Sequence, residues 1–179
     1  MNHALTRAAI AAALTFAASG AQAADKIKVG FMLPYSGTYA ALGTAIENGF
    51  KLYVAEQGGK LGGREIEYFK VDDESNPAKA AENANRLIKR DQVDVLIGTV
   101  HSGVAMALAK AAKDSDTTLI VTNAGANAIT GPLCSPGIFR TSFTNWQPAY
   151  AMGPVAVAKG HKTAVTTVSY THLTLPTKA

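Results

Sequence analysis

The residues best placed to do chemistry form a short run between a predicted strand and a predicted helix. This run, TVHSG at positions 99–103, follows the apolar segment Val93–Ile97. Ser102 is a candidate N-cap of the next helix, because a serine hydroxyl accepts hydrogen bonds from the first helical amides. Those amides also carry unpaired N–H groups and a partial positive charge, which suit a carboxylate. We expect Ser102, Gly103 and His101 to contact an anionic group of a ligand.

The same run does not fit a hydrolase or a cofactor enzyme. A nucleophile elbow has the pattern Gly-x-Ser-x-Gly, whereas Val100 and Val104 occupy the two glycine positions around Ser102. The four histidines are scattered, and neither a phosphate-binding glycine loop nor a metal-ligand spacing occurs. The acidic cluster Asp72–Glu74 indicates a strand end and turn rather than acid–base chemistry. We therefore expect a protein that is not an enzyme and that uses no cofactor or metal.

The first 23 residues have the pattern of a secretory signal peptide. A short segment with a positive charge at Arg7 precedes the apolar run Ala8–Ala18, and small residues surround an A-x-A site that ends at Ala23. The apolar run is shorter than the roughly 20 residues that a membrane-spanning helix needs. No cysteine lies near the cleavage site and no Arg-Arg pair precedes it, which excludes a lipid anchor there and twin-arginine export. The pattern predicts cleavage after Ala23, export to the periplasm and no membrane insertion afterwards.

The last residues differ in composition from the rest of the sequence. The run SYTHLTLPTKA at positions 169–179 resembles the translated read-through of a sequencing-library adapter. An ordinary strand that ends at Pro176 is the alternative. We interpret residues 168–179 as a non-native tail and base no functional argument on them.

Segments with strand and helix patterns alternate along the remaining chain. Helical spacing of apolar residues predicts helices at about 42–57, 77–90, 103–113 and 148–159. The predicted strands are Ile27–Leu33, Arg64–Val71, Val93–Ile97, Thr118–Thr122, Ile138–Thr141 and Lys162–Thr167. This order predicts an α/β fold with a parallel sheet covered on both faces and right-handed crossovers. Ligands of such sheets bind beyond the carboxyl ends of the strands, which selects the loops Pro34–Thr38, Thr99–Gly103 and Asn123–Asn127.

Charge and cysteine content narrow the range of partners. The net charge is +4 and the basic residues are scattered, without a basic run that contains aromatic residues. We therefore expect no nucleic-acid partner, and at most a weak preference for anionic solutes. Cys134 is the single cysteine, so no intramolecular disulfide can form.

Several segments, taken in order, resemble type I periplasmic binding proteins of the leucine/branched-chain amino acid-binding superfamily of ABC transporter substrate-binding proteins. The matching segments are Ile27–Leu33 with Tyr35–Gly37, Gly43 and its helix, the glycine pairs at 58–59 and 62–63, Asp72-Asp73 before Asn76-Pro77, Val95–Gly98, and Asn123–Ala126. The resemblance implies two Rossmann-like lobes, each with a doubly wound parallel sheet, that close on a solute. It also implies an N-terminal ligand-binding lobe at 24–145, and a hinge crossing with the start of a truncated second lobe at 146–167.

The resemblance also assigns roles to individual residues. It implies that Ser102 holds a ligand carboxylate and that the backbone carbonyl of Ala124, next to Gly125, meets an ammonium group. Ala126 stands where leucine-binding relatives carry a threonine, and Leu42 stands where an aromatic residue packs on their ligand. Residues at the relatives' disulfide positions are here a serine and a histidine, Ser75 and His101. Tyr35, in the matching Tyr-Ser-Gly segment, completes the expected ligand-binding set.

These departures affect the expected solute. Without the threonine hydroxyl, the site is less suited to fix the headgroup of an α-amino acid. The run TVHSGVAMA at 99–107 also resembles a branch of the family that is associated with the uptake of aromatic carboxylates. We expect a periplasmic component that delivers a small carboxylate-bearing solute, an amino acid or an aromatic acid, to a membrane permease and ATPase. A soluble extracytoplasmic sensor is the first alternative, and a secreted hydrolase is a weaker one.

Overall fold

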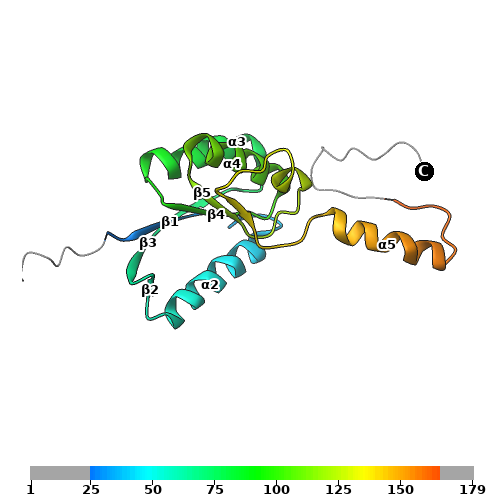
Figure 1. Cartoon of the computed structure of the whole chain (residues 1–179), viewed down its shortest axis with the longest axis horizontal. Helices are drawn as coiled ribbons and strands as arrows, with labels where there is room; N and C mark the ends of the chain where they lie inside the picture. Colours follow the sequence, from blue (N-terminus) through cyan, green and yellow to red (C-terminus); the bar gives the residue numbers. More distant parts are fainter. Residues whose placement is uncertain (1–24, 166–179) are drawn as a thin grey trace, which may run out of the picture.

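The computed structural model describes residues 25–165, and its described part is one α/β lobe followed by a helix (Figure 1). The predicted signal peptide with its cleavage site, and the tail at 168–179, lie outside the described residues.

A six-stranded sheet forms the centre of the lobe. Its strands lie in the order β2-β3-β1-β4-β5-β6, and every neighbouring pair is parallel except β2 and β3. The bounds are β1 Ile27–Leu33, β2 Lys60–Leu61, β3 Arg64–Asp72, β4 Val95–Gly98, β5 Thr118–Val121 and β6 Ile138–Arg140. The predicted parallel α/β sheet is therefore confirmed. The two-residue strand β2 lies between the glycine pairs at 58–59 and 62–63 and pairs antiparallel with β3.

Helices cover both faces of the sheet, as a doubly wound fold requires (Figure 1). Their bounds are α2 Ala40–Glu56, α3 Pro77–Asn85 with the π-helical turn η1 Arg86–Arg90, α4 Ser102–Ser115, the 3₁₀ turn η2 Asn127–Thr130, and α5 Trp146–Ala158. In Figure 1, α2 lies on one side of the sheet, and α3 and α4 lie on the other.

The α2 face is held by aromatic and branched side chains. Val29, Phe31 and Leu33 alternate along β1 and are buried on this face. The Phe31 ring meets the edge of Phe50 from α2 at a centroid distance of 5.5 Å and stacks on Tyr68 from β3 at 5.8 Å. These contacts seat α2 across β1 and β3.

The opposite face carries the larger apolar cluster. Ala80, Ala84 and Leu87 from α3 and η1 are fully buried there, with Leu108 from α4. The apolar spacing of this helix, taken from the sequence alone, favours burial of Ala81, but Ala81 is exposed and the preceding Ala80 is buried. Asn76 caps α3, because its side-chain oxygen accepts a hydrogen bond of 3.0 Å from the Ala78 amide, and Pro77 takes the first helical position.

Helix α5 follows the lobe and extends away from it (Figure 1). None of its residues is buried, and Trp146 and Tyr150 stack on each other at a centroid distance of 4.8 Å. The strand predicted at 162–167 is not formed over residues 162–165, its described part. Strands are stable only beside a neighbouring strand, and none of the described strands pairs with this segment.

Candidate functional site

Three loops meet the carboxyl edge of the sheet around its topological switch point. Strand β1 lies between β3 and β4. The chain passes from β1 to β3 on one side of β1, and then crosses to β4 on the other side. The loops after β1, β4 and β5 are the three that the sequence selected. In doubly wound sheets, this edge is where ligands bind.

The N-terminus of α4 is capped by His101, and not by Ser102 as predicted. Helix α4 begins at Ser102, and the Nδ1 atom of His101 accepts hydrogen bonds from the amides of Gly103 at 3.1 Å and Val104 at 3.4 Å. The His101 carbonyl accepts the first intrahelical bond, from Ala105 at 3.0 Å. An N-cap satisfies the second and third helical amides, and the imidazole nitrogen does this in place of a hydroxyl. Ser102 becomes the first helical residue.

The side chains around this cap are tightly placed. Ser102 is 4% exposed, and His101 and Gly103 are partly buried. A Cβ atom on Gly103 would lie 2.8 Å from Cγ of Pro77 and 3.0 Å from Cε1 of His101. Glycine is therefore required where α3 and the capping ring both approach α4.

The loop after β5 lies against the loop after β4. The amide of Ala124 donates a hydrogen bond of 3.0 Å to the carbonyl of Thr99. Ala124 and Ala126 are buried, with exposures of 1% and 2%. The structure therefore joins the two loops that carry most of the predicted ligand residues.

The chain leading into α5 fixes the rest of this loop. The Gly125 carbonyl accepts a hydrogen bond of 2.8 Å from the Asn145 amide, and a Cβ atom on Gly125 would lie 2.2 Å from the Asn145 Oδ1 atom. The Ala126 carbonyl accepts one of 3.0 Å from the Arg140 guanidinium. In the described lobe, the carbonyl groups of Gly125 and Ala126 are therefore hydrogen-bonded to other residues of the chain.

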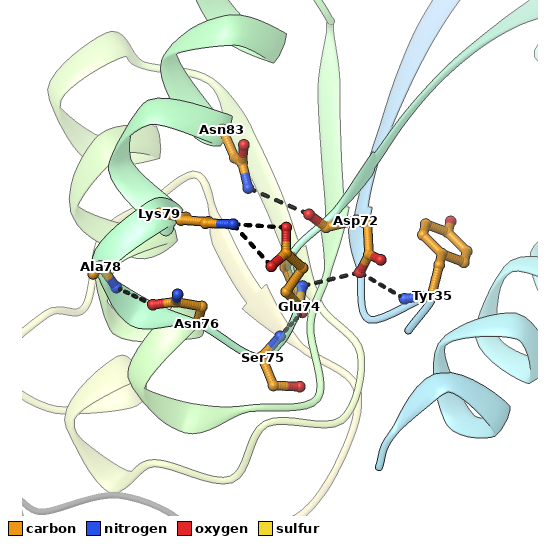
Figure 2. A network of polar contacts seen from close by, with 9 residues as sticks. Tyr35, Asp72, Glu74, Ser75, Asn76, Ala78, Lys79 and Asn83 are labelled. Carbon is orange, nitrogen blue, oxygen red and sulfur yellow. Dashed lines mark hydrogen bonds and ion pairs between the residues drawn. The ribbon is translucent and has the colours of Figure 1, made fainter. Parts of the chain in front are cut away.

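The side chain of Tyr35 is held on the α2 side of the sheet. Lys70 Nζ lies 3.6 Å from the centroid of its ring, and burial together with the Glu47 carboxylate raises the pKa of its hydroxyl. Its backbone amide donates 2.9 Å to Oδ1 of Asp72, which ties the loop after β1 to the end of β3 (Figure 2). Leu42, in the first turn of α2, is 46% exposed.

The turn between β3 and α3 is a network of polar contacts (Figure 2). Asp72 Oδ1 also accepts from the Glu74 amide at 2.9 Å. Burial alone would raise the pKa of Asp72, but hydrogen bonds from the Tyr35 and Glu74 amides lower it. The Glu74 carboxylate pairs with Lys79 at 2.8 Å. As the sequence indicated, these acidic residues build a turn.

Asp73 and Thr99 lie next to the site, but neither belongs to the ligand-binding set expected from the sequence. Both are fully buried. The Thr99 hydroxyl donates to Oδ2 of Asp73, and the Ser75 amide donates to Oδ1 at 2.8 Å. Burial raises the pKa of Asp73, and these hydrogen bonds offset part of that effect. The available signal was that each polar residue lies two positions after the end of a predicted strand.

A pocket on the described lobe lies away from these loops. It has a volume of about 420 Å³ and is lined by α3, η1 and α4, through residues such as Asn85, Lys89 and Lys110. None of its lining residues belongs to the three loops. Within residues 25–165, no cluster of three or more His, Cys, Asp or Glu side chains could hold a metal ion. No helix in this range is long and apolar enough to span a bilayer.

The fold and the arrangement at its carboxyl edge define one lobe of the type I periplasmic binding protein fold. A family model described as periplasmic binding protein matches residues 26–173, and the chain belongs to this family. The match extends a few residues beyond position 168, where we placed the start of a non-native tail; that boundary stays a prediction.

Similar proteins are solute-binding components of transporters. The chain is 35% identical over 159 residues to Leu/Ile/Val-binding protein homolog 6 of Brucella abortus. The aligned residues make up 88% of this chain and 40% of that protein. A solute-binding protein of an ABC transporter from R. palustris, solved in complex with benzoate, is 56% identical, with a TM-score of 0.73 over 76% of this chain and 38% of that one. Another from R. palustris, in complex with 4-hydroxybenzoate, is 36% identical, with a TM-score of 0.69 over 76% and 37%. The chain thus spans about two fifths of the length of these proteins.

Proposed function

We propose that this chain supplies the N-terminal lobe of the periplasmic solute-binding component of an ABC importer, and that its solute is a small aromatic carboxylate. The observation that carries this proposal is the 56% identity with a solute-binding protein that was solved with benzoate. The matched region covers 76% of the chain, and the second similar structure also holds a benzoate derivative. A branched-chain amino acid is the second candidate, because the Brucella relative is named for leucine, isoleucine and valine.

The proposed site lies at the carboxyl edge of β4 and β5. Ser102 and the first turn of α4, with His101 and Gly103, would meet the carboxylate, since a helix N-terminus attracts an anion. The loop Ala124–Ala126 would lie behind the solute ring. Because its side chains are two buried methyl groups and a hydrogen, this loop offers no hydroxyl to an α-ammonium group. Tyr35 and Leu42 would border the solute from the loop after β1 and from α2.

The proposed partners and location follow from the class of protein. A periplasmic binding protein of an ABC importer hands its solute to a membrane permease that an ATPase drives. We propose that the mature chain begins after Ala23 and works in the periplasm without entering the membrane. The second lobe would close over the solute from the opposite side.

Calorimetric titration of the two-lobed polypeptide that contains this lobe tests the proposal. Benzoate and 4-hydroxybenzoate should bind, whereas benzamide, which has the same ring without the charge, should bind at least tenfold more weakly, or about 1.4 kcal/mol. Leucine and isoleucine test the second candidate in the same assay. Binding of a sugar with no binding of any carboxylate would refute the proposal.

Two alternatives make different predictions. A soluble sensor would present the same solute to a signalling receptor, so its gene should neighbour a sensor kinase rather than a permease and an ATPase. A secreted hydrolase should cleave generic esters; we expect no such activity, because Ser102 begins a helix outside any elbow sequence.

A further inference from the structure

We infer that Asp73 and Thr99 form a positioning pair that holds the two loops of the proposed solute site, 101–103 and 124–126, in their relative places. The inference rests on the proposed function, because it assigns a role to residues behind that site. Neither residue belongs to the expected ligand-binding set, and both lie at the carboxyl edge of the sheet.

The Asp73 carboxylate is a fully buried junction between strand ends. One oxygen accepts from the Thr99 hydroxyl, and the other accepts from the Ser75 amide at 2.8 Å. The Asp73 backbone adds two bonds: its amide donates to the Leu33 carbonyl at 3.0 Å, and its carbonyl accepts from the Asn76 amide at 2.8 Å. Asp73 therefore connects the end of β1, the N-cap of α3 and the loop after β4.

Thr99 carries the connection onward to the proposed site. Its carbonyl accepts the Ala124 amide at 3.0 Å, which fixes the loop after β5. Along the chain, Thr99 lies two residues before the α4 cap, His101, and three before Ser102. A continuous line of hydrogen bonds therefore runs from Leu33 through Asp73 and Thr99 to Ala124, across the ends of β1, β4 and β5.

A buried carboxylate is costly to retain unless its hydrogen bonds are complete. When they are complete, such a network orders the groups around it. A binding site gains affinity when its contact residues are held in place before the ligand arrives. Asp73 has both carboxylate oxygens occupied, so the pair can preorganise the two loops without touching the solute.

Three substitutions in the two-lobed polypeptide test the inference. Thr99→Val keeps the shape of the side chain and removes the hydroxyl, Asp73→Asn removes the charge, and Thr99→Ser keeps the hydroxyl. Benzoate affinity should fall about tenfold or more in Thr99→Val, because the buried Asp73 carboxylate loses its donor. The fall should be smaller in Asp73→Asn, because the asparagine oxygen can still accept from the Ser75 amide and its NH2 group can donate to the Thr99 hydroxyl oxygen, so that weaker neutral hydrogen bonds replace charge-assisted ones. Thr99→Ser should restore affinity to within about threefold of the parent.

Asp94→Asn is the matched control. Asp94 also accepts a backbone hydrogen bond, from the Lys28 amide at 2.8 Å, but it precedes β4 at the opposite edge of the sheet. This variant should bind benzoate as the parent does. Affinities are measured at a temperature where denaturation curves show each variant to be folded. If folded Thr99→Val binds benzoate as tightly as the parent, or if Thr99→Ser is as weak as Thr99→Val, the positioning role is wrong.

Hydrogen exchange separates this inference from the proposed function. In folded Thr99→Val, the amides of Ser75 and Ala124 should exchange faster than in the parent, while amides within β1 keep their protection. Should the parent fail to bind benzoate while these two amides respond, the proposed solute is wrong and the network stands. If the parent binds benzoate and neither amide responds, the network does not hold the loops.

Discussion

Glu47 is a buried carboxylate that is neutralised by two lysines from different elements. It is 7% exposed, and its two oxygens lie 2.6 Å from Lys51 Nζ, one turn along α2, and 2.8 Å from Lys70 Nζ on β3. Burial by itself would raise the pKa of Glu47, but the hydrogen bonds from Lys51 and Lys70 outweigh it and lower the pKa from 4.5 to about 2. The pair with Lys70 links α2 to the sheet.

We predict that Glu47→Gln lowers the free energy of unfolding by about 1–2 kcal/mol at neutral pH, because two charge-assisted hydrogen bonds are weakened. The folded pKa is depressed, so the stabilisation is complete above pH 4.5 and is lost as the pH falls from there toward about 2. Urea denaturation at pH 7 and at pH 3 measures both effects. The difference between parent and variant should shrink at the lower pH.

Glu65→Gln is the control for this prediction. Glu65 pairs with Lys26 at 3.3 Å, but both side chains are more than half exposed. An exposed pair contributes little, so the variant should change the free energy of unfolding by less than about 0.5 kcal/mol. An equal effect of the two substitutions would contradict the role assigned to burial.

The prediction of the α2 helix shows what apolar spacing can and cannot settle. The spacing located the helix to within two residues at its start, but Leu42 and Tyr53, two of the apolar residues that share this spacing, are 46% and 55% exposed. The buried positions are Gly43, Glu47 and Val54. A charged residue on a helix indicates a solvated face, and the lysine on β3 that allows Glu47 to be buried is not visible in the sequence of α2.

The sequence likewise predicted some features of the candidate site and missed others. Strand ends at the switch point could be inferred from the alternation of elements, and the three loops that they selected follow β1, β4 and β5 at one edge of the sheet. The capping residue was not predictable in the same way, because serine is the commoner N-cap and His101 caps only where Gly103 leaves room for its ring. The burial of Asp73 depends on Thr99, which is 26 residues away in sequence.

Two glycines of α2 offer a matched test of its packing. A Cβ atom on Gly43 would lie 1.9 Å from the Pro34 carbonyl oxygen, whereas nothing lies within 4 Å of a Cβ atom on Gly49. Gly43→Ala should lower the free energy of unfolding by about 2 kcal/mol or more, because the helix must move away from the end of β1. Gly49→Ala should raise it by about 0.5–1 kcal/mol through helix propensity alone. Thermal denaturation of both variants should give shifts of opposite sign.

The N-cap of α4 can be tested with two substitutions of His101. His101→Ala should lower the free energy of unfolding by about 1 kcal/mol, because the amides of Gly103 and Val104 lose their acceptor. His101→Asn should recover most of this loss, because an asparagine oxygen is a good N-cap acceptor. Urea denaturation compares the two variants. Equal destabilisation by both would mean that His101 stabilises the fold through its ring packing rather than through the cap.

At the scale of the whole molecule, the described lobe has features of an incomplete unit. Helix α5 carries apolar side chains on all sides and buries none of them; Trp146, Tyr150 and Val157 are 55%, 66% and 78% exposed. A helix that is apolar all round is normally buried. The proposed second lobe would supply this cover, and it would also supply the other half of the solute site.

We therefore predict that the polypeptide of residues 24–167, tested alone, binds benzoate at least 100-fold more weakly than the two-lobed polypeptide. A small-molecule site normally buries about 70–90% or more of its ligand, and one lobe can contact only one side of the solute. The lost burial affects affinity even where Ser102 and the α4 N-terminus keep their geometry. Parallel calorimetric titrations of the two polypeptides measure the ratio. Equal affinities would place the complete site within this single lobe and would remove the need for closure.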